Sequence, residues 1–160
     1  LELADEVIVM NNAKIEQVGN PQEVYDRPAS PFVIEFLGNV NRFAAHANPL
    51  RSAGTDVLYV RPHDVDIIRN YEGEHGLRVR VQHVFSAGNT GRVALIRADN
   101  GETIDAELSR VRLAELSLVA GDEAWVVFRH IRLFPAGAFA ERDVDTDDTN
   151  LTNVDAGRGI

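Results

Sequence analysis

One short segment of the sequence combines small residues with a permanent positive charge. It reads Ser-Ala-Gly-Asn-Thr-Gly-Arg at residues 86–92. Consecutive small residues can turn several backbone N–H groups toward one point, and an arginine adds a fixed charge beside them. A plain hairpin turn with an exposed arginine explains the same residues, and the sequence favours this simpler interpretation. The candidate oxyanion-binding residues are Ser86, Gly88, Asn89, Thr90, Gly91 and Arg92.

The histidines and acids do not follow a pattern typical of metal binding or acid–base catalysis. Asp64 and Asp66 alternate along an expected strand, and we expect them on a solvent-exposed face. The chain has no cysteine, which excludes disulfides and thiolate metal ligands. We therefore expect no catalytic residue and no metal site. The histidines lack the spacing that brings ligands to one face: His46, His63, His75, His83 and His130.

The sequence also lacks the residues that hold a nucleoside triphosphate. No G-x-x-x-x-G-K-[ST] loop is present, and the single lysine is Lys14. Without such a loop, no row of backbone amides cradles the phosphates and no lysine reaches them. We therefore expect that this chain alone neither binds nor hydrolyses ATP and uses no cofactor.

The first 41 residues contain signals for a hairpin followed by two short helices. The apolar run Val7–Met10 predicts a buried strand, and Asn11 and Asn12 favour a tight turn into a second strand. Asn20, with Pro21 next to it and Glu three residues later, predicts a capped helix. Ser-Pro at residues 30–31 opens the second helix in the same way.

This part of the chain resembles the end of the nucleotide-binding domain in ATP-binding cassette (ABC) importer ATPases. The resemblance rests on LADEVIVMNNAKIEQVGNPQEVYDRP at residues 3–28 and SPFVIEFLGNVN at residues 30–41. Ala13 departs from the family, which usually has glycine there. The resemblance implies that the residues that bind ATP and Mg²⁺, the signature sequence and the switch histidine precede Leu1 in a longer parent protein. Residues 1–41 are then a remnant of that domain.

From residue 42 onward the pattern changes to short strands separated by turns. Such spacing, with turns about every 8–12 residues, is typical of a small β-barrel or sandwich. One or two helical turns are expected at 110–118. The expected strands cover residues 43–47, 56–62, 65–68, 77–84, 92–98, 103–108, 125–128 and 131–134.

Two further strings carry a second resemblance. YVRPHDVDI at residues 59–67 and LSLVAGDEAWVVF at residues 116–128 look like the TOBE-type, OB-like barrel that follows the ATPase domain in these importers. Pro-His before the aspartate is most similar to the sulfate/thiosulfate branch, since maltose-type subunits usually have Arg-Pro-Glu there. The expected fold class is therefore mainly β, with this barrel at residues 42–138.

Charge and hydropathy exclude several other classes of protein. The net charge is −9 and no basic stripe is present, which argues against nucleic-acid binding. No apolar run approaches the ~18–20 residues that span a membrane. Residues 139–160 are acidic and contain few apolar side chains, so we expect a disordered tail.

The resemblance also implies a function for the parent protein. It would couple ATP hydrolysis to sulfate/thiosulfate uptake, as a homodimer docked beneath two inner-membrane permease subunits on the cytoplasmic face. The present chain would supply dimer contact and regulation. Two alternatives stay open: an accessory domain of an importer for another substrate that binds a regulatory protein, and an oxyanion-binding module like the related barrel of molybdate importers.

Overall fold

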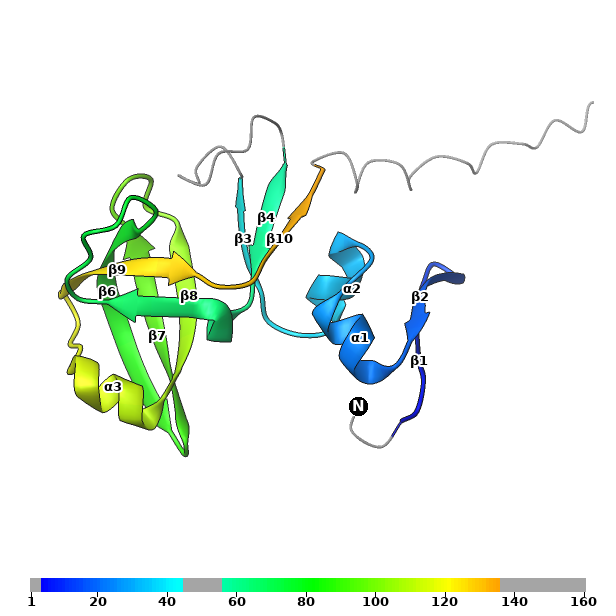
Figure 1. Ribbon diagram of the computed structural model, residues 1–160, viewed down its shortest axis with the longest axis horizontal. Helices are drawn as coiled ribbons and strands as arrows, with labels where there is room; N and C mark the ends of the chain where they lie inside the picture. The colour runs from blue at the N-terminus through cyan, green and yellow to red at the C-terminus, as the bar shows by residue number, and fades with distance from the viewer. Residues whose placement is uncertain (1–3, 45–55, 136–160) are drawn as a thin grey trace, which may run out of the picture.

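The computed structural model describes residues 4–44 and 56–135, and most of its regular structure is β. Figure 1 shows a five-stranded sheet at one end of the long axis and two helices with a hairpin at the other, with a three-stranded sheet between them. The mainly β fold class is confirmed. The predictions for residues 45–47 and for the tail at 139–160 lie outside the described residues, and the domain boundaries stay predictions.

The hairpin is formed by β1 (Val7–Asn11) and β2 (Lys14–Gly19). Its turn consists of Asn12 and Ala13, whose φ values are 47° and 59°, while Asn11 pairs with Lys14 inside the ladder. The turn therefore lies one residue later than predicted. Ala13 adopts a left-handed conformation that glycine would adopt without steric cost.

The two predicted helices are present with the expected caps. α1 (Pro21–Asp26) begins after Asn20, whose side chain accepts a hydrogen bond from the Glu23 amide at 2.8 Å. α2 (Pro31–Phe36) begins after Ser30, whose hydroxyl accepts from the amide of Val33. Buried valines of β1, α1 and α2 pack together into a small core of their own. No helix in the described ranges has the length and apolar character needed to cross a bilayer.

The three-stranded sheet joins segments that are distant in the sequence. β4 (Val57–Val60) lies at its centre, with β3 (Asn41–Ala44) and β10 (Ile131–Phe134) on either side, and both pairings are antiparallel. The central strand is almost completely buried. Residues 57–60 are therefore held by a strand on each side, which also sets where the segment after them begins.

The larger sheet has the order β5-β9-β6-β7-β8, and every neighbouring pair is antiparallel. Its core is lined by Val65, Ile67, Val79, Val81, Val93, Leu95, Ile104, Ala106 and Val126, all at most 2% exposed. The strands are β5 (Val65–Ile68), β6 (Leu77–Ala87), β7 (Thr90–Arg97), β8 (Thr103–Ser109) and β9 (Glu123–Phe128).

The expected barrel is OB-like but is not closed, which corrects the prediction. β5 and β8 are the two edges of the sheet, and no strand ladder joins them among the described residues, although they lie close together. The short 3₁₀ helix η2 (Pro62–Asp64), rather than a longer β5, lies against β8. This segment does not complete the ladder, since its backbone is 3₁₀-helical and Pro62 has no N–H to donate.

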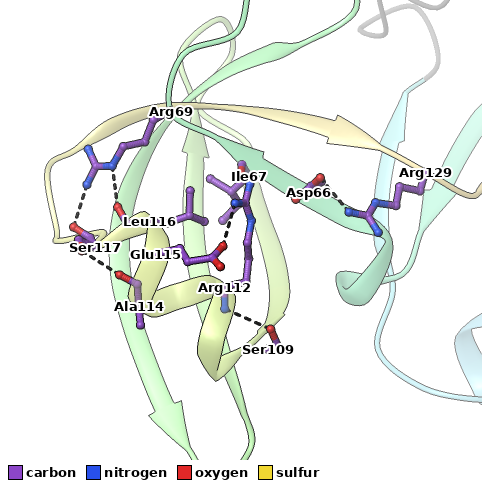
Figure 2. Close-up of polar contacts among 10 residues, drawn as sticks. All are labelled: Asp66, Ile67, Arg69, Ser109, Arg112, Ala114, Glu115, Leu116, Ser117 and Arg129. Carbon is purple, nitrogen blue, oxygen red and sulfur yellow. Dashed lines mark hydrogen bonds and ion pairs between the residues drawn. The ribbon is translucent and has the colours of Figure 1, made fainter.

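One helix covers the end of the larger sheet and is tied to β5. α3 (Arg110–Leu116) is followed by Ser117, and the carbonyl oxygens of Leu116 and Ser117 accept hydrogen bonds from Arg69 at 2.6 and 2.8 Å. Arg112 donates to the backbone of β5 at 3.2 Å. Figure 2 shows Arg69 reaching the end of α3, where it contacts Leu116 and Ser117. A cation at the C-terminal end of a helix satisfies carbonyls that have no partner within the helix.

One face of the β1–β2 hairpin exposes four apolar side chains. Ile8 pairs with Val18, and Met10 pairs with Ile15, so all four lie on the same side of the hairpin. Their exposed fractions run from 47% to 61%. The opposite face packs onto α1 and α2 through Val9. An exposed apolar strand pair is a surface that readily associates with another chain.

We predict that replacing Ile8 and Ile15 together by threonine weakens self-association of the 160-residue chain by roughly tenfold, because apolar area at the contact is lost. Threonine keeps the strand propensity of isoleucine. Sedimentation velocity at several protein concentrations measures the effect. Val119→Thr changes an apolar side chain that is 61% exposed elsewhere, and should leave association unchanged. A monomeric wild-type chain would contradict this prediction.

Tyr59 in β4 carries a buried hydroxyl that has no hydrogen-bond partner among the described residues. Burial, supported by the nearby Glu35, raises the pKa of Tyr59 from 10.0 to about 12. The folded state therefore holds the phenol proton more tightly than the unfolded state. This contribution to stability is complete below pH 10 and is lost as the pH rises through about 12.

We predict that the free energy of unfolding of the wild type falls by about 2 kcal/mol between pH 10 and pH 12 through this group. Tyr59→Phe removes the ionisable hydroxyl and should lose that part of the slope while remaining as stable as wild type at neutral pH. Urea unfolding across this pH range measures both values. Tyr71→Phe leaves Tyr59 in place and should keep the wild-type slope. An unchanged slope in Tyr59→Phe would show that another group is responsible.

Candidate functional site

The predicted oxyanion loop is the tip of the β6–β7 hairpin. Only Gly88 and Asn89 form the turn, and Gly88 has a φ of 66°. Ala87 pairs with Thr90 in the strand ladder. The turn therefore takes up only two residues of the segment 86–92, because a glycine with positive φ allows the strands to reverse within two residues.

The backbone carbonyls and the arginine of this hairpin already face partners. The carbonyl oxygen of Asn89 accepts from the amide of Arg110 at 3.0 Å, and that of Gly88 accepts from the Arg110 side chain at 3.4 Å. Arg92 lies 3.7 Å from the carboxylate of Glu107 across the strand pair, and its side chain is 61% exposed. These contacts describe an ordinary hairpin, and oxyanion binding at residues 86–92 stays a prediction.

Gly91 has a structural role at the same place. A Cβ built on it would lie 2.2 Å from Cδ1 of Leu113 and 2.7 Å from the carbonyl oxygen of Phe85. A side chain would require both Leu113 of α3 and the backbone of β6 to move away from β7. The glycine therefore allows α3 to pack closely on the sheet.

A second part of the fold gathers charged side chains around a cavity of about 510 Å³. The cavity lies where α1 meets the segment after β4, η2 and the start of β10. The string YVRPHDVDI, which carries the second family resemblance, contributes four of the lining residues. Tyr59, Arg61, His63 and Asp64 line it from that string, and Tyr25, Asp26, Arg27, His130 and Arg132 line it from other segments.

Arg61 is the most deeply buried cation of this cavity, with an exposed fraction of 7%. Its Cζ lies 3.8 Å from the centre of the Tyr25 ring, and its Nη2 donates to the backbone carbonyl of Tyr25 at 3.4 Å. Among the described residues no carboxylate forms an ion pair with it. Burial lowers the pKa of Arg61 below its usual value, although the more distant Asp64 and Asp26 act in the opposite direction.

Arg97 shows how the same fold satisfies a buried guanidinium elsewhere. Arg97 is 1% exposed, and its nitrogens lie 2.5 Å from Asp99 and 2.9 Å from Glu102. The hydrogen bond from Arg97 lowers the pKa of Asp99 below its usual value. Buried charges are normally paired in this way, because an unpaired one costs a large desolvation free energy. Arg61 lacks such a pair within the described residues.

The rim of the cavity is polar and its acids are engaged. His130 Nδ1 lies 2.8 Å from one oxygen of Asp64, and His63 Nε2 lies 3.6 Å from the other. The ring of His63 is parallel to that of Tyr25 at 6.4 Å. Arg132 donates to the backbone carbonyl of Asp26. The rim therefore connects η2, β10 and α1.

The expectation that Asp64 and Asp66 form a solvated face is wrong. Their side chains are only 15% and 22% exposed. Asp66 forms an ion pair with Arg129 at 2.8 Å, as Figure 2 shows, and Asp64 contacts the histidines of the cavity. Asp66 lies opposite Arg129 and Asp64 lies opposite His130, both from the segment after β9. The spacing in the sequence does not reveal these contacts.

The cavity does not show in the sequence, because its residues come from distant segments. Arg61 and Tyr25 are 36 positions apart. One signal was available: an arginine directly follows the buried apolar run Val57–Val60 and precedes Pro62. A charged side chain at the end of a buried strand is rarely buried without a partner or a ligand. The described residues contain no group of three or more acids and histidines suited to hold a metal ion.

The amino-acid sequence of this chain is similar to those of several known proteins. Residues 71–129 match the TOBE-like domain family. The chain is 40% identical over 153 residues to the sulfate/thiosulfate import ATP-binding protein CysA of Nitrosomonas europaea, which covers 84% of this chain and 42% of that protein. It is 41% identical over 151 residues to CysA of Burkholderia pseudomallei, with 85% and 43% covered. CysA 2 of Shewanella oneidensis is 35% identical over 150 residues, with 84% and 42% covered.

A solved structure also resembles the chain. The cytoplasmic molybdate-binding protein ModG, with molybdate bound, aligns with a TM-score of 0.48 and 20% identity, covering 57% of this chain and 69% of ModG.

The similarity to the CysA proteins is not confined to the TOBE-like part. A match that covers 84% of the chain cannot lie within residues 42–160 alone, because that range is shorter than 84% of the chain. The match therefore includes part of residues 1–41. The chain spans less than half the length of these relatives, in their C-terminal part. The resemblance drawn from the sequence motifs is thus confirmed: the chain carries a TOBE-like domain and is similar, over most of its length, to the C-terminal part of sulfate/thiosulfate import ATP-binding proteins.

Proposed function

We propose that this chain is the regulatory and dimer-contact region of the ATP-binding subunit of a sulfate/thiosulfate importer. The observation that carries the proposal is the similarity to CysA proteins, which extends from the TOBE-like part into the first 41 residues. In this role ATP hydrolysis takes place in other parts of the subunit. The subunit acts as a homodimer beneath two membrane permease subunits, on the cytoplasmic face of the membrane.

The contacts of Arg61 support a regulatory role. Arg61 follows β4 of the mainly β part, while Tyr25 belongs to α1 in the part that resembles the end of the nucleotide-binding domain. Arg132, from β10, makes a second contact to the carbonyl of Asp26. A movement of β4 or β10 therefore displaces α1 directly. Such a connection lets the TOBE-like part influence the ATPase part of the subunit.

A hybrid protein tests this function. The part of Nitrosomonas europaea CysA that this chain does not cover is joined to the present chain, and the hybrid is expressed in a bacterium that lacks its own CysA. We expect growth on sulfate as the sulfur source to be restored. The same part of CysA without the present chain is the control and should not support growth. A hybrid that is folded and hydrolyses ATP but does not restore sulfate uptake would contradict the proposal.

We predict that the 160-residue chain alone shows no saturable binding of Mg-ATP. The sequence has no phosphate-binding loop, and its single lysine, Lys14, lies in β2 of the hairpin. Phosphoryl transfer depends on such loops, metal ligands and charged groups to position the phosphates. Isothermal titration calorimetry measures the binding, with full-length CysA of Nitrosomonas europaea as the positive control. Saturable binding at micromolar concentration would overturn the prediction.

A further inference from the structure

We infer that the cavity between α1 and the segment after β4 binds a small oxyanion, with the guanidinium of Arg61 as its main donor. This inference concerns the chain itself and does not depend on which substrate the proposed importer carries. It differs from the predicted loop at residues 86–92, which lies on the β6–β7 hairpin. Three observations carry it: a buried cation without a counter-ion, a second unsatisfied polar group, and the engagement of the nearby acids.

The first observation is the state of Arg61. The side chain is 93% removed from solvent, since its exposed fraction is 7%. Only its Nη2 has a hydrogen-bond partner among the described residues, and that partner is a neutral carbonyl at 3.4 Å. The guanidinium has five N–H donors in a planar fork that matches the oxygens of an oxyanion. The guanidinium also lies over the Tyr25 ring, with its Cζ 3.8 Å from the ring centre.

The second observation is Tyr59, which lines the same cavity. Its hydroxyl is buried and makes no hydrogen bond of good geometry within the described residues, although the Glu35 side chain lies near enough to raise its pKa. Because the phenol keeps its proton at neutral pH, it is a donor. Most N–H groups of Arg61 have no acceptor, and a buried phenol lies beside the same cavity. This favours a ligand that accepts several hydrogen bonds and carries negative charge.

The third observation concerns the charges around the cavity. Asp64 contacts both His130 and His63, and the carboxylate of Asp26 accepts from Gln22 at 2.8 Å. The acids are therefore directed to partners of their own. Arg27 and Arg132 add two further cations to the lining. The arginines outnumber the acids, which favours an anion over a cation.

The size of the cavity suits a small ligand together with bound water. A volume of about 510 Å³ lies within the range of small-molecule sites, and such sites are common where two parts of a fold meet. A tetrahedral oxyanion presents oxygens in several directions. It can therefore accept from Arg61 and from donors of the rim at the same time. Binding should stabilise α1 against the β part of the chain.

Nuclear magnetic resonance of the full 160-residue chain tests the inference. Sodium sulfate, sodium thiosulfate and sodium phosphate are titrated separately, and sodium chloride at matched ionic strength is the control for screening. The spectra include the side-chain Nε–H signals of arginine. We expect saturable shifts for Arg61 and for the backbone amides of residues 25–27, 59–61, 63–64 and 130–132 with at least one oxyanion. The three anions show which oxyanion chemistry the site prefers.

Variants then assign the donor. Arg61→Gln should weaken oxyanion binding roughly tenfold to hundredfold, because it removes charge-assisted hydrogen bonds. Arg61→Lys keeps the charge but loses the planar fork, and should fall between Gln and wild type. Arg92→Gln removes an arginine that is 61% exposed in the hairpin, and should leave the affinity unchanged. Circular dichroism and thermal melts verify that each variant is folded.

Arg27→Gln provides a second test if Arg61→Gln fails to fold. Arg27 lines the cavity and is exposed, so its replacement should not disturb the core. A severalfold loss of affinity is expected.

The inference is overturned by any of three results: no saturable shifts at millimolar oxyanion, the same shifts with sodium chloride, or shifts confined to residues 86–92. An affinity of folded Arg61→Gln equal to that of wild type would also overturn it.

Discussion

The contact between Arg61 and Tyr25 joins the two parts of this structure. The guanidinium lies 3.8 Å from the ring centre, and a parallel arrangement of Tyr25 with His63 continues the contact toward η2. Cation–π contacts of this kind gain strength when they are shielded from water. Because β4 is held between β3 and β10, Arg61 leaves the sheet at a fixed place and direction. The contact therefore bears on the position of α1 and on the shape of the cavity that both residues line.

The two buried arginines illustrate different uses of one side chain. Arg97 is enclosed by Asp99 and Glu102 and closes the end of β7 as a structural ion pair. Arg61 is almost as buried but lies beside a neutral carbonyl, an aromatic ring and a cavity. A protein that pairs one buried cation so fully gains nothing in stability by leaving the other without a counter-ion. The difference favours a functional explanation of Arg61, in which a ligand from solution supplies the negative charge.

The features that could be predicted from the sequence are those that depend on residues close together in the chain. The caps at Asn20 and Ser30 and the order of the later strands follow from local spacing and appear in the structure. Open sheet edges could not be predicted, because η2 lies against β8 only after the chain has folded. The cavity combines Tyr25, Arg61 and residues near 130, and no local pattern connects segments so far apart. The motif YVRPHDVDI indicated a family but not its physical role, which depends on the partners that the fold brings to Arg61.

A double-mutant cycle on Arg61 and Tyr25 tests the central claim most directly. Amide hydrogen exchange at Val24, whose N–H donates to the carbonyl of Asn20 within α1, measures the free energy of opening that helix. Arg61→Gln, Tyr25→Leu and the double variant are compared with wild type. We predict that the two substitutions are not additive, with a coupling free energy of about 0.5–2 kcal/mol. Additive effects, or unchanged exchange at Val24 in both single variants, would contradict the account.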